Sequence, residues 1–439
     1  MISNFMSQIT AALGPTPHPA VEITGTGTLP SCFATSDFSI ATLAAAAGEL
    51  AGLTDQTASV NRRHGLMWFD MTVHPIDWEM PNLWNPIAGD YETADGWIRL
   101  HTNAPHHCAA ALSVLNCDAD RNAVANTVKD WAKTDLETKI VAAHGAAAAM
   151  HTQAEWAEHP QGRAVASEPL IAWETFSGNA PPTPLNALKV LDLTRVLAGP
   201  VATRFLAGFG AQVLRIDPPD WDEDGVVQEV TLGKRCAGLD LKTTSGRATF
   251  ETLLADADVL VHGYRPGALA GMGYDPAALR KIAPNLIDVS LCAYGHTGPW
   301  AARRGFDSLV QMSSGIANEG MIRAGTDRPK PLPMQALDHG TGYLIAATVL
   351  RALRMRNETG QSSSARLSLA RSAALLTSVP AHEYEGEALS SLPADIDNQI
   401  EKTSWGPVHR IKFPISIDGT LASWPQPAGY LRRHPPVWV

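Results

Sequence analysis

The sequence predicts an α/β fold in which a doubly wound, Rossmann-like parallel sheet follows a smaller α+β domain. From Lys189 onward, short apolar runs alternate with segments of helix length, which is the pattern of a parallel sheet. Before that point, residues 89–170 contain a hairpin signal followed by several helical stretches. Between the two parts, residues 171–187 are rich in proline, which indicates a linker.

The composition is that of an ordinary globular protein with two or three domains. Of 439 residues, 45% are hydrophobic and 18% are charged, and the net charge of -10 argues against a nucleic-acid-binding protein. We find neither a membrane-spanning apolar run nor the pattern of a signal peptide, so we expect a cytoplasmic protein without membrane contact. The five cysteines and the histidines His101, His106 and His107 lack metal-ligand spacing, so no metal is expected.

The first 88 residues are expected to hold an alanine-rich helix over residues 36–53 and a short strand over residues 57–61. The same order of an aspartate, an alanine-rich helix, a turn and a short strand returns after Asp338. This similarity indicates an imperfect internal repeat, although two alanine-rich helices that end in turns also arise by chance.

The small domain, residues 89–170, begins with a hairpin whose turn is Asp95-Gly96. Helices are expected around residues 105–116, 119–132, 135–150 and 153–158. The large domain, residues 188–375, is expected to hold five strands that begin near residues 190, 212, 238, 258 and 286, and a sixth near 363. Residues 376–439 form a Pro/Trp-rich tail, which we expect to wrap around a neighbouring surface.

Ligands of such sheets bind beyond the carboxyl ends of the strands. Four loops are expected there together: 194–200, 218–225, 263–267 and 294–299. Asp307 follows the last of them, at the start of an apolar run. Its side chain has two interpretations, as the N-cap of a helix or as a reactive carboxylate that attacks an acyl group or moves a proton.

Seven stretches, in this order, resemble the class III CoA-transferase family (formyl-CoA transferase and carnitine dehydratase-like, or CaiB/BaiF). They are residues 190–200, 210–217, 234–242, 261–267, 272–274, 295–299 and 305–315. Residues 89–100 resemble the opening of the family's small domain. The resemblance implies a CoA-transferase that moves CoA from an acyl-CoA to a carboxylic acid through an aspartyl-acyl anhydride and an aspartyl-CoA thioester.

The resemblance also implies site residues and an assembly. Asp307 matches the catalytic aspartate, and the family works as an interlocked dimer, so we expect a homodimer. The residues that would bind CoA are Arg195, Val196, Ala198, Leu239, Lys242, Gly263, Tyr264, Arg265, Met272 and Tyr294.

Three departures from the family pattern leave other functions open. Pro218 and Gly271 stand where basic residues are common, and the small domain precedes the large one. The last feature indicates a fusion of two copies, with residues 1–88 as the remnant of a first large domain. One alternative is an acyl-CoA racemase. It is disfavoured because Phe306 stands where racemases have a histidine, although Asp338 matches their second acid. The other alternative is a CoA-binding protein without activity. A nicotinamide dehydrogenase is disfavoured because no GxGxxG motif follows the first strand.

Overall fold

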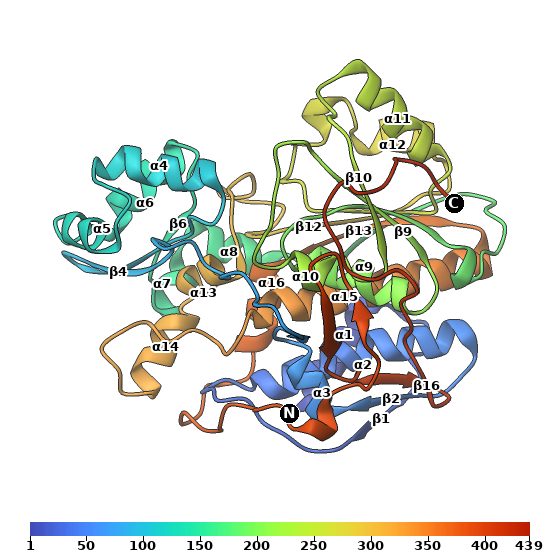
Figure 1. The fold of residues 1–439 in the computed structure, drawn as a ribbon, viewed down its shortest axis with the longest axis horizontal. Helices are drawn as coiled ribbons and strands as arrows, with labels where there is room; N and C mark the ends of the chain where they lie inside the picture. The colour runs from blue at the N-terminus through green and yellow to red at the C-terminus, as the bar shows by residue number, and fades with distance from the viewer.

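The computed structural model describes all residues 1–439, and its centre is a seven-stranded sheet (Figure 1). Six strands are parallel and have the order of a doubly wound fold, which confirms the predicted fold class. In spatial order the strands are β10 (Lys234–Gly238), β9 (Gln212–Asp217), β8 (Lys189–Leu193), β11 (Val259–His262), β12 (Ile287–Cys292), β13 (Ser362–Ser368) and the antiparallel β7 (Ala172–Phe176).

Helices cover both faces of this sheet because its strands are apolar on both sides. Leu191 and Leu214 belong to one buried cluster with α11 (Thr244–Ala255) and α12 (Pro276–Ile282). Their sequence neighbours Val190 and Val213 belong to the main cluster on the opposite face. The helices that contribute to that cluster include α1 (Ile2–Leu13), α2 (Thr35–Thr54), α3 (Arg62–Met67), α9 (Ala198–Gly208), α15 (Ala336–Thr359) and α16 (Leu369–Thr377).

The N-terminal segment is fixed to the large domain by the packing of α2 along α15. Buried Glu49 of α2 accepts hydrogen bonds from Arg351 Nε at 2.9 Å and Arg354 Nη1 at 3.0 Å. A carboxylate without these partners would be costly to bury, so the charges fix the register of the two helices.

The two parts of the proposed repeat have the same local topology. After α2, β2 (Ala58–Asn61) pairs in parallel with β1 (Val21–Thr24) and antiparallel with β16 (Ile415–Ile417). After α15, β13 pairs in parallel with β12 and antiparallel with β7. This correspondence supports the proposal that residues 1–88 descend from a first copy of the large domain.

The C-terminal tail folds back onto the N-terminal segment, and the two lie together below the sheet in Figure 1. Within the tail, β15 (Pro407–Arg410) pairs with β3 (Val73–Pro75), and β16 pairs with β2. Near the chain end, His434 bridges to β10 and covers this edge of the large sheet. The remaining tail strands are β14 (Glu401–Lys402) and β17 (Thr420–Leu421).

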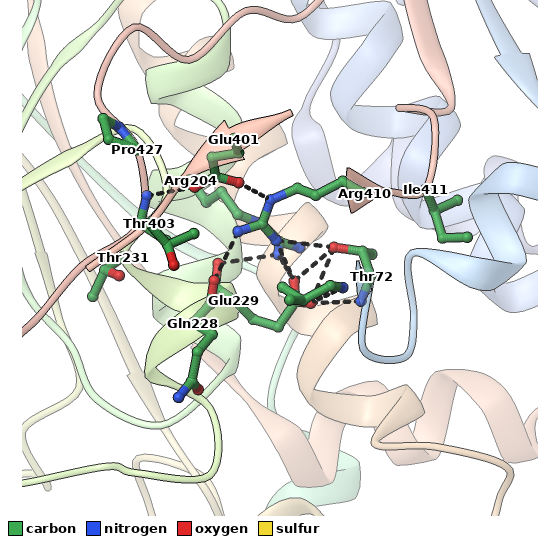
Figure 2. A network of polar contacts seen from close by, with 12 residues as sticks. Thr72, Arg204, Gln228, Glu229, Thr231, Glu401, Thr403, Arg410, Ile411 and Pro427 are labelled. Atoms are coloured by element: carbon green, nitrogen blue, oxygen red, sulfur yellow. Dashed lines mark hydrogen bonds and ion pairs between the residues drawn. The ribbon is translucent and has the colours of Figure 1, made fainter. Parts of the chain in front are cut away.

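A buried polar network joins the tail, the N-terminal segment and the large domain (Figure 2). Glu229 of α10 (Val227–Val230) accepts from Arg204 of α9 at 2.8 Å and from Arg410 of β15 at 3.3 Å. Its carboxylate also accepts from the backbone N–H and the hydroxyl of Thr72. Because Glu229 compensates charges from two distant parts of the chain, it holds the tail in place.

The small unit stands at the left of Figure 1 and has its own hydrophobic cluster, from Ile87 to Ala147. It consists of β4 (Gly89–Thr93), β5 (Gly96–Leu100), β6 (Ala147–Ala149), α4 (Pro105–Leu115), α5 (Arg121–Val128) and α6 (Lys133–Ala142). Two helices follow the small unit in the chain, α7 (Gln153–Glu158) and α8 (Pro160–Ser167). Two others follow β12 of the large sheet, α13 (Asp307–Ser313) and α14 (Ile316–Arg323).

Three sequence-based expectations are wrong in detail. The strand expected to begin near residue 238 is β10, which starts at Lys234 and ends at Gly238. The helix expected over residues 135–150 ends at Ala142, and Ala147–Ala149 pairs with β5 instead. His144 has a φ of 64°, which stops the helix, and the partner strand then overrides the helix preference of alanine. Residues 171–187 are not an irregular linker throughout, because they contribute β7 to the edge of the large sheet. None of the helices combines the length and the hydropathy that crossing a membrane requires.

Candidate active site

A cavity of about 500 Å³ opens at the carboxyl ends of five parallel strands. Its walls are the loops after β8, β9, β10, β11 and β12, where a doubly wound sheet binds ligands. Residues from these loops that line it include Thr194–Ala198, Pro218, Asp220, Trp221, Leu239–Lys242, Gly263–Arg265 and Leu291–Ala293.

Four cations of the cavity wall, Arg195, Lys242, Arg265 and Arg304, form no ion pair within the protein. The fifth, Arg303, is bound by Glu137 of the small unit at 2.7 Å. Unpaired guanidinium and ammonium groups in one cavity favour an anionic ligand, and phosphate groups suit them because they accept charge-assisted hydrogen bonds.

Arg195 lies between two aromatic rings. Its Cζ is 5.0 Å from the ring centroid of Trp221 and 5.7 Å from that of Tyr264. The next residue, Val196, has a φ of 65°, which is unfavourable for a β-branched side chain. Glu223 holds this conformation by accepting the Val196 N–H at 2.6 Å. Such strain is common where a loop is shaped for a ligand.

The small unit covers this cavity within the same chain. His106 and His107 of α4 line it, and His101 at the end of β5 stacks on Phe306 with 3.7 Å between ring centroids. Burial, together with the neighbouring His106, lowers the pKa of His107 to about 3. These imidazoles are therefore neutral at physiological pH, and the positive charge of the cavity comes from arginine and lysine.

Asp307 is the first residue of α13, but its carboxylate caps a different helix. Its Oδ2 accepts the backbone N–H of Asp338, in the first turn of α15, at 2.9 Å, and its Oδ1 accepts from Gln311 Nε2. The residue before α15, Gln335, offers no side-chain cap. Asp307 thus satisfies a free donor at the positive end of a 24-residue helix.

Two buried carboxyl groups meet at this point. Burial raises the pKa of Asp307 to about 6, although Gln311 and the N–H of Asp338 favour its ionised form. Burial and the charge of Asp307 raise the pKa of Asp338 well above its ordinary value. Of the two carboxyl groups, Asp338 therefore holds its proton more strongly, and Asp307 is the one that ionises first as pH rises.

The structure brings together most of the residues that the sequence singled out. Nine of the ten expected CoA-binding residues line the cavity, and Tyr294 does not. Tyr294 is fully buried, with its hydroxyl 3.1 Å from Ser313 Oγ. Asp307 does not itself line the cavity, because its carboxylate is buried beside Phe306 and Asp338, which do.

Sequence reasoning missed the contribution of His106, His107 and Trp221 to the cavity wall. The two histidines reach the cavity because the small unit docks over it, and no local pattern signals this contact. The strand-end rule did place the loop of Trp221, residues 218–225, at this edge, but it did not single out the tryptophan.

A family model described as CoA-transferase family III matches residues 185–412, just over half of the chain. The chain belongs to this family. The match covers β8 to β13, the strand-end loops of the cavity, Asp307 and part of the tail, whereas His106 and His107 of the cavity wall lie outside it.

Curated relatives match over part of their length. An acetyl-coenzyme A transferase of Hypoxylon pulicicidum is 36% identical over 45% of this chain and 34% of its own. The succinyl-CoA:glutarate CoA-transferase of Mus musculus is 32% identical over 52% of each chain. The chain therefore spans between a third and about half of the length of these relatives. A solved structure of a Mycobacterium tuberculosis protein is 29% identical over 45% of this chain and 58% of its own, with a TM-score of 0.40.

Proposed function

We propose that this protein transfers CoA from an acyl-CoA to a carboxylic acid, with Asp307 as the nucleophile. The observation that carries the proposal is the position of Asp307. It is an ionised, buried carboxylate at the edge of a cavity that offers four unpaired cations. CoA is the substrate that matches this cavity, because its phosphates suit the cations and its thioester is an electrophile for a carboxylate.

The proposed reaction has four steps. Asp307 attacks the thioester carbonyl, which forms a mixed anhydride and releases CoA thiolate. The thiolate attacks the aspartyl carbonyl, which forms an aspartyl-CoA thioester and releases the donor acid as its carboxylate. The acceptor carboxylate attacks this thioester and releases the thiolate again. The thiolate then attacks the acceptor's acyl carbonyl, which yields the new acyl-CoA and restores Asp307.

The residues around Asp307 have defined parts in this proposal. The N–H of Asp338 and the side chain of Gln311 hold the two carboxylate oxygens. The raised pKa of Asp338 favours its protonated form, which would donate a hydrogen bond to an oxyanion at the cavity wall. The Phe306 ring, stacked on His101, must shift before a thioester reaches the carboxylate, since Asp307 is fully buried.

The substrate class follows from the relatives only as a proposal. Their printed names include succinyl-CoA:glutarate, acetyl-CoA:oxalate and formyl-CoA:oxalate CoA-transferases. We infer short carboxylic acids as partners, and we keep the prediction of a homodimer and of a cytoplasmic location.

Trapping tests the nucleophile directly. The protein is incubated with acetyl-CoA or succinyl-CoA, treated with hydroxylamine and digested, and the peptide that contains Asp307 is weighed by mass spectrometry. We expect a hydroxamate at Asp307, absent from Asp307→Asn and from protein mixed with free CoA. A hydroxamate at another carboxyl group, or CoA transfer at the normal rate by Asp307→Asn, would refute the proposal.

The racemase alternative retains one supporting observation, which is the second carboxyl group, Asp338, at the cavity wall beside Asp307. A racemase needs a second group that exchanges a proton on the other face of the α-carbon, and Phe306 cannot do so. His101, which stacks on Phe306, is buried, and burial lowers its pKa well below the ordinary value. Incubation of 2-methylacyl-CoA in deuterium oxide distinguishes the two. Deuterium at the α-carbon without CoA exchange would favour the racemase, whereas tight CoA binding with neither reaction would favour a binding protein.

A further inference from the structure

A second, smaller cavity of about 220 Å³ lies against the residues that hold Asp307. Its lining includes Arg99, Ser308 and Gln311. Phe306 lines the large cavity and Ser308 lines the small one, so Asp307 stands between the two in the chain. Two residues donate hydrogen bonds to the carboxylate of Asp307. Asp338 lines the large cavity and Gln311 lines the small one.

The wall of the small cavity contains a partly unused arginine. Arg99 of β5 donates from Nη1 to Asp90 at 2.7 Å, and this is its only hydrogen bond. Its Nε is buried without a partner, and its Nη2 makes no hydrogen bond. Nε and Nη2 together form one edge of the guanidinium fork, which matches the two oxygens of a carboxylate. Trp84 packs on the guanidinium at 4.9 Å from Cζ to the ring centroid, so neither nitrogen of this edge is used by the aromatic contact.

Ser308 is the second unsatisfied group. Its hydroxyl is buried and has no hydrogen-bond partner. Buried polar groups normally find partners, so two unsatisfied groups on the wall of one cavity indicate a polar ligand. The cavity has room for about seven waters at about 30 Å³ each, which suits a small organic acid rather than CoA.

The charges in and around the cavity decide where such an acid binds. Asp90 also lines the cavity and balances the single charge of Arg99, so a carboxylate is attracted by the unpaired guanidinium edge rather than by a net positive field. Burial raises the pKa of Asp307, and Arg99 is close enough to counter that rise. An anion on Arg99 therefore lies within electrostatic reach of Asp307.

We propose that the small cavity binds the distal carboxylate of a dicarboxylic acid on the Nε/Nη2 edge of Arg99, with Ser308 as a further donor. This inference rests on the proposed function and specifies its acid. One carboxylate of the acid attacks the aspartyl-CoA thioester at Asp307, which forms a mixed anhydride and expels CoA thiolate. The other carboxylate stays on Arg99 and takes no part in bond making.

The test compares glutarate with valerate, which have equal chain length and differ in the second carboxylate. Calorimetry measures the binding of each acid to the full chain, and steady-state kinetics with acetyl-CoA as donor measure kcat/KM for each. The variants are Arg99→Met and, as a matched control, Arg163→Met, whose side chain is 58% exposed. We expect Arg99→Met to weaken glutarate binding and kcat/KM about tenfold to hundredfold more than it weakens those of valerate, so that the preference for the dicarboxylic acid is lost. The Arg163→Met variant should behave as the wild type.

The outcomes separate this inference from the proposed function. Transfer to both acids with an unchanged glutarate preference in Arg99→Met would overturn the Arg99 site and leave CoA transfer intact. Glutarate binding that depends on Arg99, without transfer from any acyl-CoA, would support the site and overturn the transferase. If Arg99→Met also loses valerate transfer, its circular dichroism and CoA binding are compared with the wild type. Native values would then mean a general role for Arg99 at Asp307 and would overturn the distal-carboxylate assignment.

Discussion

Replacement of Asp307 by asparagine should stabilise the protein at neutral pH while it abolishes transfer. Burial raises the pKa of Asp307 from its ordinary value of 3.8 to about 6. Because each pKa unit corresponds to about 1.4 kcal/mol, ionisation of Asp307 costs the folded state about 3 kcal/mol. Asparagine keeps an oxygen for the N–H of Asp338 and carries no charge, so it avoids this cost.

The sign of the effect sets its pH dependence. The folded pKa lies above the unfolded value, so the wild type loses stability as pH rises from about 4 through about 6. Asp307→Asn should lack this loss. The difference in unfolding free energy should be small at pH 4 and reach about 3 kcal/mol at pH 7. The charge of Asp307 is also the second cause of the raised pKa of Asp338. Its removal therefore makes ionisation of Asp338 less costly for the folded state.

Urea denaturation at pH 4, 5, 6 and 7, followed by tryptophan fluorescence, measures this difference. Asp130→Asn, at an exposed position of the small unit, is the control and should track the wild type. An Asp307→Asn variant that is less stable than the wild type at pH 7, or equally stable at every pH, would contradict the reasoning. It would show that the capping bond to α15 outweighs the cost of ionisation.

Three further predictions concern CoA binding, the tail and assembly. Lys242→Met and Arg265→Met should each weaken CoA binding roughly three- to tenfold in calorimetry. Added salt should weaken CoA binding by the wild type. Equal affinity of the wild type and both variants for CoA would exclude these cations as phosphate ligands. Glu229→Gln should lower the unfolding free energy by about 3–5 kcal/mol, because Arg204 loses its carboxylate partner, whereas exposed Glu387→Gln should change it little. Sedimentation at micromolar concentration should show a homodimer, and a single species at the monomer mass would contradict that prediction.

The large sheet and the loops at its strand ends were predictable because their signals are local. Buried parallel strands appear as short apolar runs, and the loops that follow them must share one edge of the sheet. This rule and the family resemblance together placed Lys242 and Arg265 correctly on one cavity wall. Tyr294 was misplaced because its loop turns inward, where its ring packs against Trp300.

The rest depends on contacts between distant segments. Ala147–Ala149 has the composition of a helix and becomes a strand only because β5 offers a partner. Likewise, β7 forms where β13 presents a free edge. The small cavity requires Arg99 from the small unit and Gln311 from α13, which lie more than two hundred positions apart in the sequence. No periodicity or spacing carries such information.

The two interpretations of Asp307, helix cap and reactive carboxylate, do not exclude each other. The structure shows a cap, but on α15 rather than on its own helix. The pKa of about 6 already includes the capping bond, so ionisation of this buried group costs about 3 kcal/mol even with the cap in place. Asparagine or serine would supply the cap without that cost. An aspartate here is therefore poorly explained by stability alone, and the imbalance favours a chemical role for its charge.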